Sequence, residues 1–198
     1  MGISITNKRV FRENFFIDAA KNKRVLDIGC AAADGLQKLH SRIKDEATYT
    51  VGIDQQEGEG IIVCDAQNFT LDEKFDVCIA GEVIEHLGNV SGFLKSCSQA
   101  VGKNGRVIIS TPNPYSLVSL RYAIFGRKIP NDPTHVSLYD VTTFKNMLEI
   151  YMGDSIVSGE IHYYEELWSQ SPVYRLNKLF SRFIKPFSCG ILADLTIR

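Results

Sequence analysis

Three short apolar segments early in the chain each carry an aspartate at or beside their carboxyl end, and this repetition limits the folds open to the sequence. The segments are residues 24–28 (RVLDI, with Asp27), 48–53 (TYTVGI, before Asp54) and 60–64 (GIIVC, before Asp65). Their apolar residues are nearly continuous rather than alternating, which is typical of parallel strands buried on both faces. The spacing leaves room for a helix between strands, so it predicts an α/β fold.

The rest of the chain continues this alternation of strands and helices. Apolar spacing predicts helices at 12–20, 34–43, 90–101 and 142–151, and mostly helix at 165–186. Further strands are expected at 75–80, 107–110, 154–163 and 191–197. We therefore predict a Rossmann-like, doubly wound sheet of seven mostly parallel strands with an antiparallel last strand.

Length and composition favour one ordinary globular domain spanning residues 1–198. The 198 residues are 44% hydrophobic and 23% charged, and the net charge is −1. This balance gives no overall field that would recruit nucleic acid, and no apolar run reaches the length of a membrane span. We expect a soluble, cytoplasmic protein. Residues 112–139 hold four of the six prolines, which indicates a lid-like insertion over the site.

The strand ends predict a nucleoside site. Ligands of open α/β sheets bind beyond the carboxyl ends of the strands, where the strand order reverses. Gly29 permits a sharp turn there, Asp54 can accept both ribose hydroxyls, and Asp65 can face an adenine amino group beside the Ala66 backbone. Aspartate also suits ordinary strand-to-loop turns. A dinucleotide site is disfavoured because the chain lacks the G-x-G-x-x-G pattern.

The stretch GEVIEHLGN, residues 81–89, concentrates ionisable side chains after the fourth expected strand. In a helical turn Glu82, Glu85 and His86 would share one face, while Val83 and Ile84 point inward. Two carboxylates and an imidazole suit a divalent metal. A metal-free role for His86 as a base, and a purely structural role, also fit. We expect His40 to lie at the surface and His162 to be either hydrogen-bonded or solvent-facing.

The ordered set VLDIGC, VGID, CDAQNF, FDVCIAGEVIEHL and GRVIISTPNPYSL resembles class I S-adenosylmethionine-dependent methyltransferases, particularly the branch with ubiquinone-biosynthesis O-methyltransferases. The resemblance implies S-adenosylmethionine as the cofactor. The positions that it assigns to the cofactor are Asp27 and Gly29 at the methionine end, Ala31 in the loop, Asp54 at the ribose, Asp65 and Ala66 at the adenine, and Gly81 and Glu82 near the methyl group. One departure is the loop GCAAADG, in which alanines stand where the family usually has glycines.

The same resemblance extends to a metal. The pattern E-x-x-E-H with a later histidine is similar to the metal sites of small-RNA 2′-O-methyltransferases and of ubiquinone-pathway O-methyltransferases. Carried over, the ligands are Glu82, Glu85, His86 and His135, and the ion would be Mg or another divalent metal. Such an ion lowers the pKa of an acceptor hydroxyl. His86 and His135 are therefore the candidate catalytic residues.

Two further segments bear on the acceptor. Residues 113–131 could form an aromatic wall with a basic rim for an acceptor carrying a negative group, or a helix packed by its aromatic residues; the side chains concerned are Tyr115, Arg121, Tyr122, Phe125, Arg127 and Lys128. Residues 172–187 are amphipathic, which suits a helix covering the sheet, the arrangement we favour, or a helix lying on an anionic membrane.

The expected function is methyl transfer to a hydroxyl of a small molecule, including lipid- or glycan-linked ones. The alternatives are an RNA 2′-O-methyltransferase and a non-catalytic cofactor-binding protein. Because the net charge is −1, a nucleic-acid partner is disfavoured. The sequence leaves the oligomeric state open.

Overall fold

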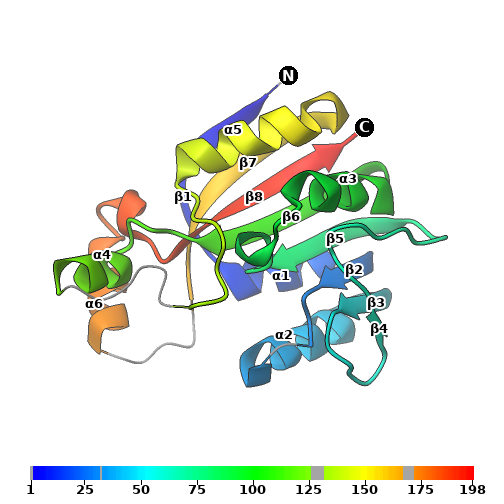
Figure 1. Ribbon diagram of the computed structural model, residues 1–198, viewed down its shortest axis with the longest axis horizontal. Coiled ribbons are helices and arrows are strands. Elements are labelled where there is room, and N and C mark those ends of the chain that lie inside the picture. The colour runs from blue at the N-terminus through cyan, green and yellow to red at the C-terminus, as the bar shows by residue number, and fades with distance from the viewer. Residues whose placement is uncertain (1, 32, 126–131, 167–171) are drawn as a thin grey trace.

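The computed structural model describes residues 2–31, 33–125, 132–166 and 172–198, and its centre is a single sheet (Figure 1). The strands are β1 (Ile3–Phe11), β2 (Arg24–Ile28), β3 (Tyr49–Asp54), β4 (Ile61–Val63), β5 (Phe75–Gly81), β6 (Val101–Pro112), β7 (Ile156–Glu165) and β8 (Gly190–Ile197). Their order is β1-β7-β8-β6-β5-β2-β3-β4. β8 lies antiparallel to both β6 and β7, and the other neighbouring pairs are parallel. The Rossmann-like sheet with an antiparallel last strand is confirmed.

The predicted count of seven strands is wrong, because the chain adds β1 at the edge of the sheet. β1 pairs in parallel with β7, and the hydroxyl of Thr6 bonds to the Ile161 carbonyl at 3.1 Å and to His162 Nδ1 at 2.7 Å. Most of its residues are at least partly exposed, so it lacks the continuous apolar run of a central strand. Its partner is remote in the sequence, which explains why the local pattern did not indicate it.

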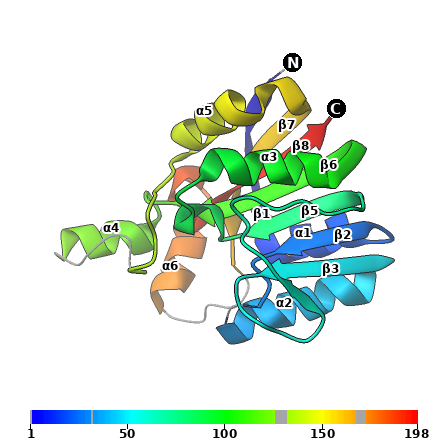
Figure 2. The ribbon, with the colours of Figure 1, turned by 45° about the vertical axis from the view of Figure 1, so that its right-hand side comes forward.

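Helices cover both faces of the sheet. They are α1 (Arg12–Ala20), α2 (Ala33–Glu46), α3 (Val90–Ala100), α4 (Leu117–Ile124), α5 (Val141–Met152) and α6 (Pro172–Phe180), with 3-10 turns η1 (Ile84–His86), η2 (Gly153–Ser155) and η3 (Lys185–Phe187). α1 and α2 lie on one face, and α3 and α5 on the other (Figure 2). α5 begins at a capping box between Asp140 and Thr143, which satisfies its first backbone N–H groups.

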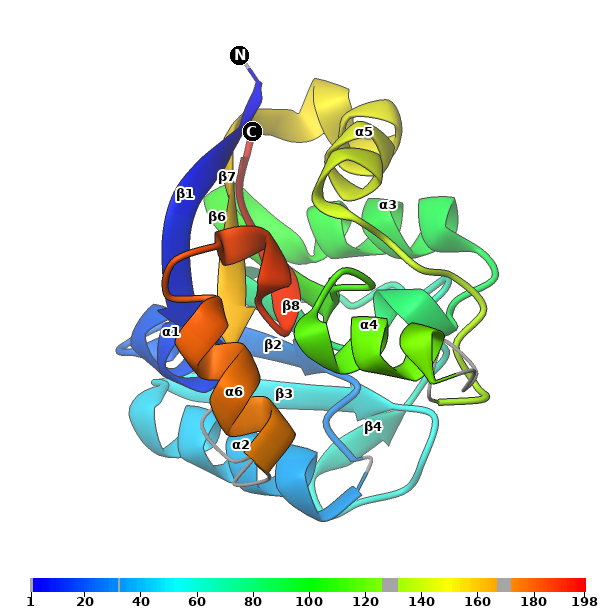
Figure 3. The same cartoon turned by 90° about the vertical axis from the view of Figure 1, so that its left-hand side faces the viewer.

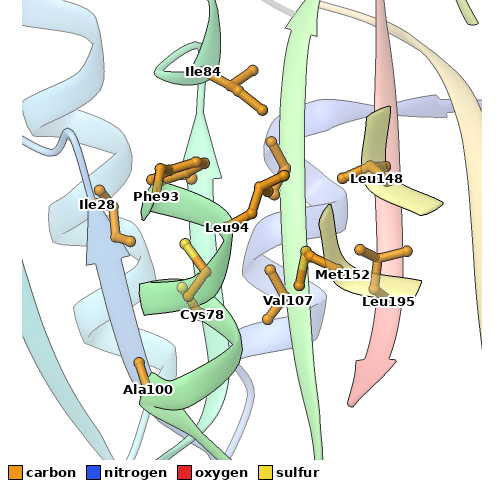
Figure 4. Packing of buried hydrophobic residues seen from close by; sticks show 14 of the residues in the cluster. Ile28, Cys78, Ile84, Phe93, Leu94, Ala100, Val107, Leu148, Met152 and Leu195 are labelled. Atoms are coloured by element: carbon orange, nitrogen blue, oxygen red, sulfur yellow. The ribbon is translucent and has the colours of Figure 1, made fainter. Parts of the chain in front are cut away.

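Alternation along the central strands builds the two halves of the core. Leu26 of β2 packs with the α3 and α5 side, whereas its neighbour Val25 packs with the α1 and α2 side. Figure 4 shows the first of these layers, in which Phe93 and Leu94 of α3 and Leu148 of α5 lie against the sheet. Both faces of the strands are buried, as their continuous apolar runs predicted.

The strand order places a switch point between β2 and β5. From β2 the chain moves outward to β3 and β4 and then returns to the other side of β2 as β5. The loops after β2 and β5 therefore diverge at the carboxyl edge of the sheet, where open α/β sheets bind ligands. Gly29 follows β2, and Glu82 follows β5, at this edge.

The described parts of residues 165–186 hold less helix than predicted, and residues 167–171 lie outside them. β7 continues to Glu165, α6 spans Pro172–Phe180, and only the short turn η3 follows. Residues 172–187 are therefore not one helix covering the sheet. α6 lies beside α4, beyond the carboxyl ends of the central strands (Figure 3). In the part of the chain that the structure describes, no helix is long and apolar enough to span a bilayer.

Candidate active site

A cavity of about 670 Å³ opens at the switch point, and many of the predicted cofactor residues line it. The predicted residues in its wall are Gly29, Asp54, Ala66, Glu82, Glu85, His86 and His135. Gly29 turns the chain at a φ of +76°, and a side chain there would place Cβ 2.4 Å from Val83 Cγ2. Both the turn and the close approach of the β5 loop require glycine at this position.

Asp54 ties two loops of the cavity together. Its carboxylate accepts hydrogen bonds from the Ala31 backbone N–H at 2.8 Å and from the Gln56 backbone N–H at 2.9 Å. The predicted cofactor residue Ala31 is thus bound to the end of β3, although the loop GCAAADG has alanine here in place of glycine. Its neighbour Ala32 lies outside the described residues.

Asp27 lies behind this cavity rather than in its wall. Its carboxylate bonds to His40 Nδ1 at 2.8 Å, and both residues are buried. Burial raises the pKa of Asp27, and the hydrogen bond from His40 opposes that rise. The predicted surface position of His40 is wrong, because α2 turns this side chain toward β2. Cys30 completes a compact group with these two residues.

Asp65 and Gly81 are not among the residues that line this cavity, although their neighbours are. Asp65 is exposed and accepts a hydrogen bond from the Gln67 backbone N–H at 2.9 Å, while Ala66 and Gln67 themselves line the wall. Gly81 packs against Phe16, whose ring a Cβ at this position would meet at 2.9 Å. Their assignment to the cofactor remains a prediction.

Glu82 departs from the arrangement that its spacing predicted. Its backbone has a φ of +59°, and the 3-10 turn begins only at Ile84, so its side chain does not share a helical face with Glu85. Glu82 Oε1 accepts a hydrogen bond from the Tyr164 hydroxyl and lies 3.3 Å from Arg12 Nη1.

The buried Arg12 guanidinium holds a second carboxylate as well as Glu82. Its Nη2 lies 3.1 Å from Glu166 Oε1, and its guanidinium carbon is 5.3 Å from the centre of the Tyr164 ring. Sequence reasoning missed Arg12, Tyr164 and Glu166. They come from the start of α1 and the end of β7, far from Glu82 in the chain, so no local spacing could reveal the contact.

Three of the four predicted metal ligands do meet. Donor atoms of Glu85, His86 and His135 lie within 4.8 Å of one another, and Glu82 is not part of this group. His135 arrives from the returning end of the insertion, where the Val136 and Ser137 N–H groups donate to the Glu85 carbonyl at 2.9 and 3.1 Å. The two imidazole rings meet edge to face, with their centres 4.6 Å apart.

Unsatisfied atoms mark this Glu85–His86–His135 cluster. Glu85 is 1% exposed, and its Oε2 accepts a hydrogen bond from Thr111 at 3.0 Å. Glu85 Oε1 and His135 Nδ1 are buried without a hydrogen-bond partner among the described residues.

The ionisation of the cluster is shifted as well. Burial, and then the charge of Glu82, raises the pKa of Glu85 well above its usual range. Burial, and then His86, lowers the pKa of His135. Both shifts favour the uncharged forms of the buried Glu85 and the partly buried His135.

A second cavity, of about 270 Å³, adjoins the first. Glu82, Asp132 and His135 line both, so these three residues stand at the junction. Its other walls come from the end of β6, α4, the end of β7, α6 and the start of β8, and include Asn113, Ser116, Tyr122, Tyr164, Glu166 and Tyr174. Burial, and then Glu166, raises the pKa of Tyr174 to about 12.

The predicted basic rim is not found among the described residues of this second cavity. Arg127 and Lys128 lie outside the described part of the chain, and Arg121 stacks on the Tyr122 ring at 4.9 Å instead of lining the wall. The walls carry the carboxylates of Glu82, Asp132 and Glu166. Where the chain is described, the cavity is acidic rather than basic.

Comparison with known proteins agrees with this geometry. The family model described as a methyltransferase domain matches residues 8–151. Ubiquinone biosynthesis O-methyltransferases are 30% identical over 108 residues in Bradyrhizobium diazoefficiens and 32% identical over 122 residues in Azorhizobium caulinodans. These matches cover 46% and 54% of this chain, but only 40% and 46% of the relatives. The chain thus spans less than half the length of the curated relatives it matches.

Solved structures share the fold over nearly the whole chain. A methyltransferase dependent on S-adenosylmethionine from Archaeoglobus fulgidus has a TM-score of 0.64 at 22% identity, covering 94% of this chain and 91% of that one. The N-methyltransferase NodS from Bradyrhizobium japonicum, in complex with S-adenosylhomocysteine, has a TM-score of 0.57 at 13% identity, covering 94% and 85%. The chain belongs to the methyltransferase domain family.

Proposed function

We propose that this chain is an S-adenosylmethionine-dependent methyltransferase that methylates a hydroxyl oxygen of a small-molecule acceptor held in the second cavity. One observation carries the proposal: the two cavities meet at Glu82, Asp132 and His135, beside the Glu85–His86–His135 cluster. A methyl donor in the first cavity and an acceptor in the second would meet at a place that holds proton-accepting groups. The partial match to ubiquinone biosynthesis O-methyltransferases supports oxygen as the acceptor atom.

The first cavity suits the cofactor. S-adenosylmethionine supplies a methyl group already activated by its sulfonium, so the protein has to bind, orient and deprotonate the acceptor. We assign Asp54 to the ribose hydroxyls, because its carboxylate lines the cavity at the end of β3. Ala66 would border the adenine. Gly29, whose φ of +76° excludes an ordinary side chain, would let the backbone approach the methionine end.

Deprotonation of the acceptor falls to the cluster at the junction. An alcohol is a poor nucleophile until its proton is removed. His135 lines both cavities, and burial lowers its pKa, so its imidazole is neutral and able to accept a proton at pH 7. His86 lies against it edge to face and bonds through Nδ1 to Thr134 at 2.9 Å, which orients the pair.

The cluster also fits the divalent metal that the sequence pattern E-x-x-E-H implies. Glu85 Oε1 and His135 Nδ1 are buried polar atoms without a described partner, and carboxylate with imidazole is a common donor set. Glu85, His86 and His135 would hold the ion, which would lower the pKa of the acceptor hydroxyl. Glu82 remains a predicted ligand, but Tyr164 and Arg12 already occupy its Oε1.

The walls of the second cavity favour a neutral or cationic acceptor. Glu82 and Glu166 share the single Arg12 guanidinium, and Asp132 adds a third carboxylate, so these groups favour a neutral or cationic molecule over a phosphate or a carboxylate. The rings of Tyr122, Tyr164 and Tyr174 give the walls aromatic surface, which suits an acceptor with an aromatic or sugar-like body. This lining argues against RNA as the acceptor, and against the anionic acceptor expected from the sequence.

Methyl transfer from labelled S-adenosylmethionine to a panel of acceptors tests the proposal. We expect transfer to neutral or amine-bearing polyols and aromatic alcohols, and little to carboxylated analogues or RNA. Mass spectrometry of the product locates the methyl group. A product methylated only on nitrogen, or a clear preference for RNA, would contradict the proposed acceptor.

Elemental analysis of purified protein, alone and after dialysis against chelator, tests the metal. Glu85→Gln should abolish metal binding, whereas Asp27→Asn in the buried group behind the cofactor loop is the matched control and should not. If the wild-type protein binds no metal and chelator leaves its rate unchanged, His135 acts as the base without an ion.

A further inference from the structure

Helix α6 and the residues just after it turn polar side chains toward the protein and apolar side chains outward. Its inward residue Asn177 is 0% exposed, and Ser181 just after the helix is also fully buried. Asn177 Oδ1 accepts a hydrogen bond from the Leu117 N–H at 2.9 Å, and Arg9 donates to Ser181 Oγ at 2.9 Å. The side that docks on the protein is therefore polar, which is the reverse of an ordinary surface helix.

The outer side of this segment is apolar. Leu176, Leu179, Phe180, Phe183 and Ile184 are all exposed, and we call them the α6 patch. Single exposed apolar residues are ordinary on protein surfaces, but five within nine residues form a contiguous surface of the kind that marks an interaction site. The inward polar contacts hold the patch outward, so it is a fixed feature of the fold.

Basic residues lie in the same segment as the α6 patch. Residues 172–187 contain four basic residues and no acidic one, in a chain whose net charge is −1; the four are Arg175, Lys178, Arg182 and Lys185. Arg175 and Arg182 are exposed, and neither has a carboxylate partner among the described residues. Apolar side chains flanked by unpaired cations match the chemistry of an anionic lipid surface.

We propose that the α6 patch and its basic flanks bind the surface of an anionic phospholipid bilayer. The apolar side chains would enter the boundary between headgroups and acyl chains, and the cations would contact lipid phosphates. A second copy of this chain is a poorer occupant, since a self-complementary interface would face these unpaired cations with their own copies. Tyr174 of α6 and Val118 and Tyr122 of α4 line the second cavity, so docking would bring that cavity to the membrane.

Flotation of the full-length chain with lipid vesicles tests the proposal independently of methyl transfer. We expect binding to phosphatidylcholine vesicles that contain phosphatidylglycerol, weakening with salt, and little binding to phosphatidylcholine alone. Arg175→Gln with Arg182→Gln should lower the partition coefficient roughly 20- to 30-fold, since each cation near an anionic surface contributes about fivefold. Lys95→Gln with Lys103→Gln, on exposed lysines elsewhere, is the matched control.

Variants of the apolar side chains test their part in vesicle binding. Leu179→Ser with Phe183→Ser, which are 56% and 75% exposed, should lower binding at least about tenfold. Ile150→Ser with Tyr151→Ser on α5, at 74% and 49%, should not. Circular dichroism checks that each variant folds.

Two outcomes overturn the membrane proposal. One is the absence of anionic-vesicle binding by the wild-type chain, or binding that survives both α6 variants. The other is self-association in sedimentation velocity that the apolar α6 variant abolishes while vesicles stay unbound, which would make the patch an interface between copies. Neither outcome bears on methyl transfer, so a failure here is distinct from a failure of the proposed function.

Discussion

Two groups of carboxylate and imidazole side chains lie near the cavity of about 670 Å³, and they differ in whether their polar atoms are satisfied. Asp27, Cys30 and His40 form one, and the Glu85–His86–His135 cluster forms the other. In the first, carboxylate and imidazole bond to each other at 2.8 Å. In the second, Glu85 Oε1 and His135 Nδ1 have no hydrogen-bond partner among the described residues.

The space beside each group differs too. The cavity beside Asp27 and Cys30 holds about 10 Å³, at most roughly the space of one water molecule. The cavities beside His135 hold about 670 and 270 Å³. Similar residue types thus serve two purposes: a closed, satisfied pair stabilises the loop after β2, and an open, unsatisfied cluster is available for chemistry. Proximity of ligand-type side chains alone would not separate the two.

The largest expected effect is on activity at the open cluster. Glu85→Gln should reduce the methylation rate by about 10²- to 10⁴-fold, the range for loss of a group that assists proton removal. Its free energy of unfolding should change little, because burial already disfavours the charged carboxylate, whose pKa is raised. Initial rates with labelled cofactor measure the first quantity, and urea denaturation the second. If Glu85→Gln methylates at the wild-type rate, the open cluster has no role in catalysis.

The closed pair should respond in stability instead. His40→Ala leaves the buried Asp27 carboxyl without its hydrogen-bond partner, and an unsatisfied buried polar group of this kind costs about 1–3 kcal/mol. Urea denaturation measures this loss, with Lys38→Ala on the exposed part of α2 as the control. Metal content should be unchanged. Loss of metal in His40→Ala, with stability retained, would mean that the roles of the two groups are reversed.

Glu82 offers a third case. It lies where the two cavities meet, like His135, but its Oε1 already has partners in Tyr164 and Arg12. Tyr164→Phe removes a hydrogen bond to a charged acceptor and should cost about 1.5–3 kcal/mol of unfolding free energy. Tyr163→Phe in the same strand is the control. If Tyr164→Phe instead leaves stability unchanged and tightens metal binding, Glu82 is the fourth ligand held back by its partners.

The smallest effect concerns His162, an imidazole far from both groups. Burial lowers its pKa below the usual 6.5. As the pH falls through 6.5, the unfolded chain takes up a proton at this residue that the folded chain does not, so stability falls, and the loss levels off below the lowered pKa. The slope from one such group is at most about 1.4 kcal/mol per pH unit. Denaturation of wild type and His162→Gln between pH 5 and 8 measures it, and parallel curves would contradict this assignment.

Local patterns predicted what depends on nearby residues. Strand ends predicted that Gly29 and Asp54 would lie together, and both line the larger cavity, because the carboxyl ends of parallel strands share one edge. The pattern E-x-x-E-H with a later histidine predicted that His135 would join Glu85 and His86, which the returning insertion accomplishes. Local patterns failed for β1, for the buried position of His40 and for the outward apolar face of α6, each of which depends on a distant partner.

The sequence by itself determined the succession of strands and helices from α1 onward in outline, and the residue types gathered at the carboxyl edge, since both follow from short-range periodicity. Only the tertiary structure decided which of Glu82 and Glu85 keeps a carboxylate oxygen without a hydrogen-bond partner. Glu82 adopts a positive φ and bonds to Tyr164 and Arg12 from β7 and α1, whereas the 3-10 turn buries Glu85 with one oxygen unpaired. That choice depends on long-range contacts that balance burial against hydrogen bonding, and no spacing along the chain encodes it.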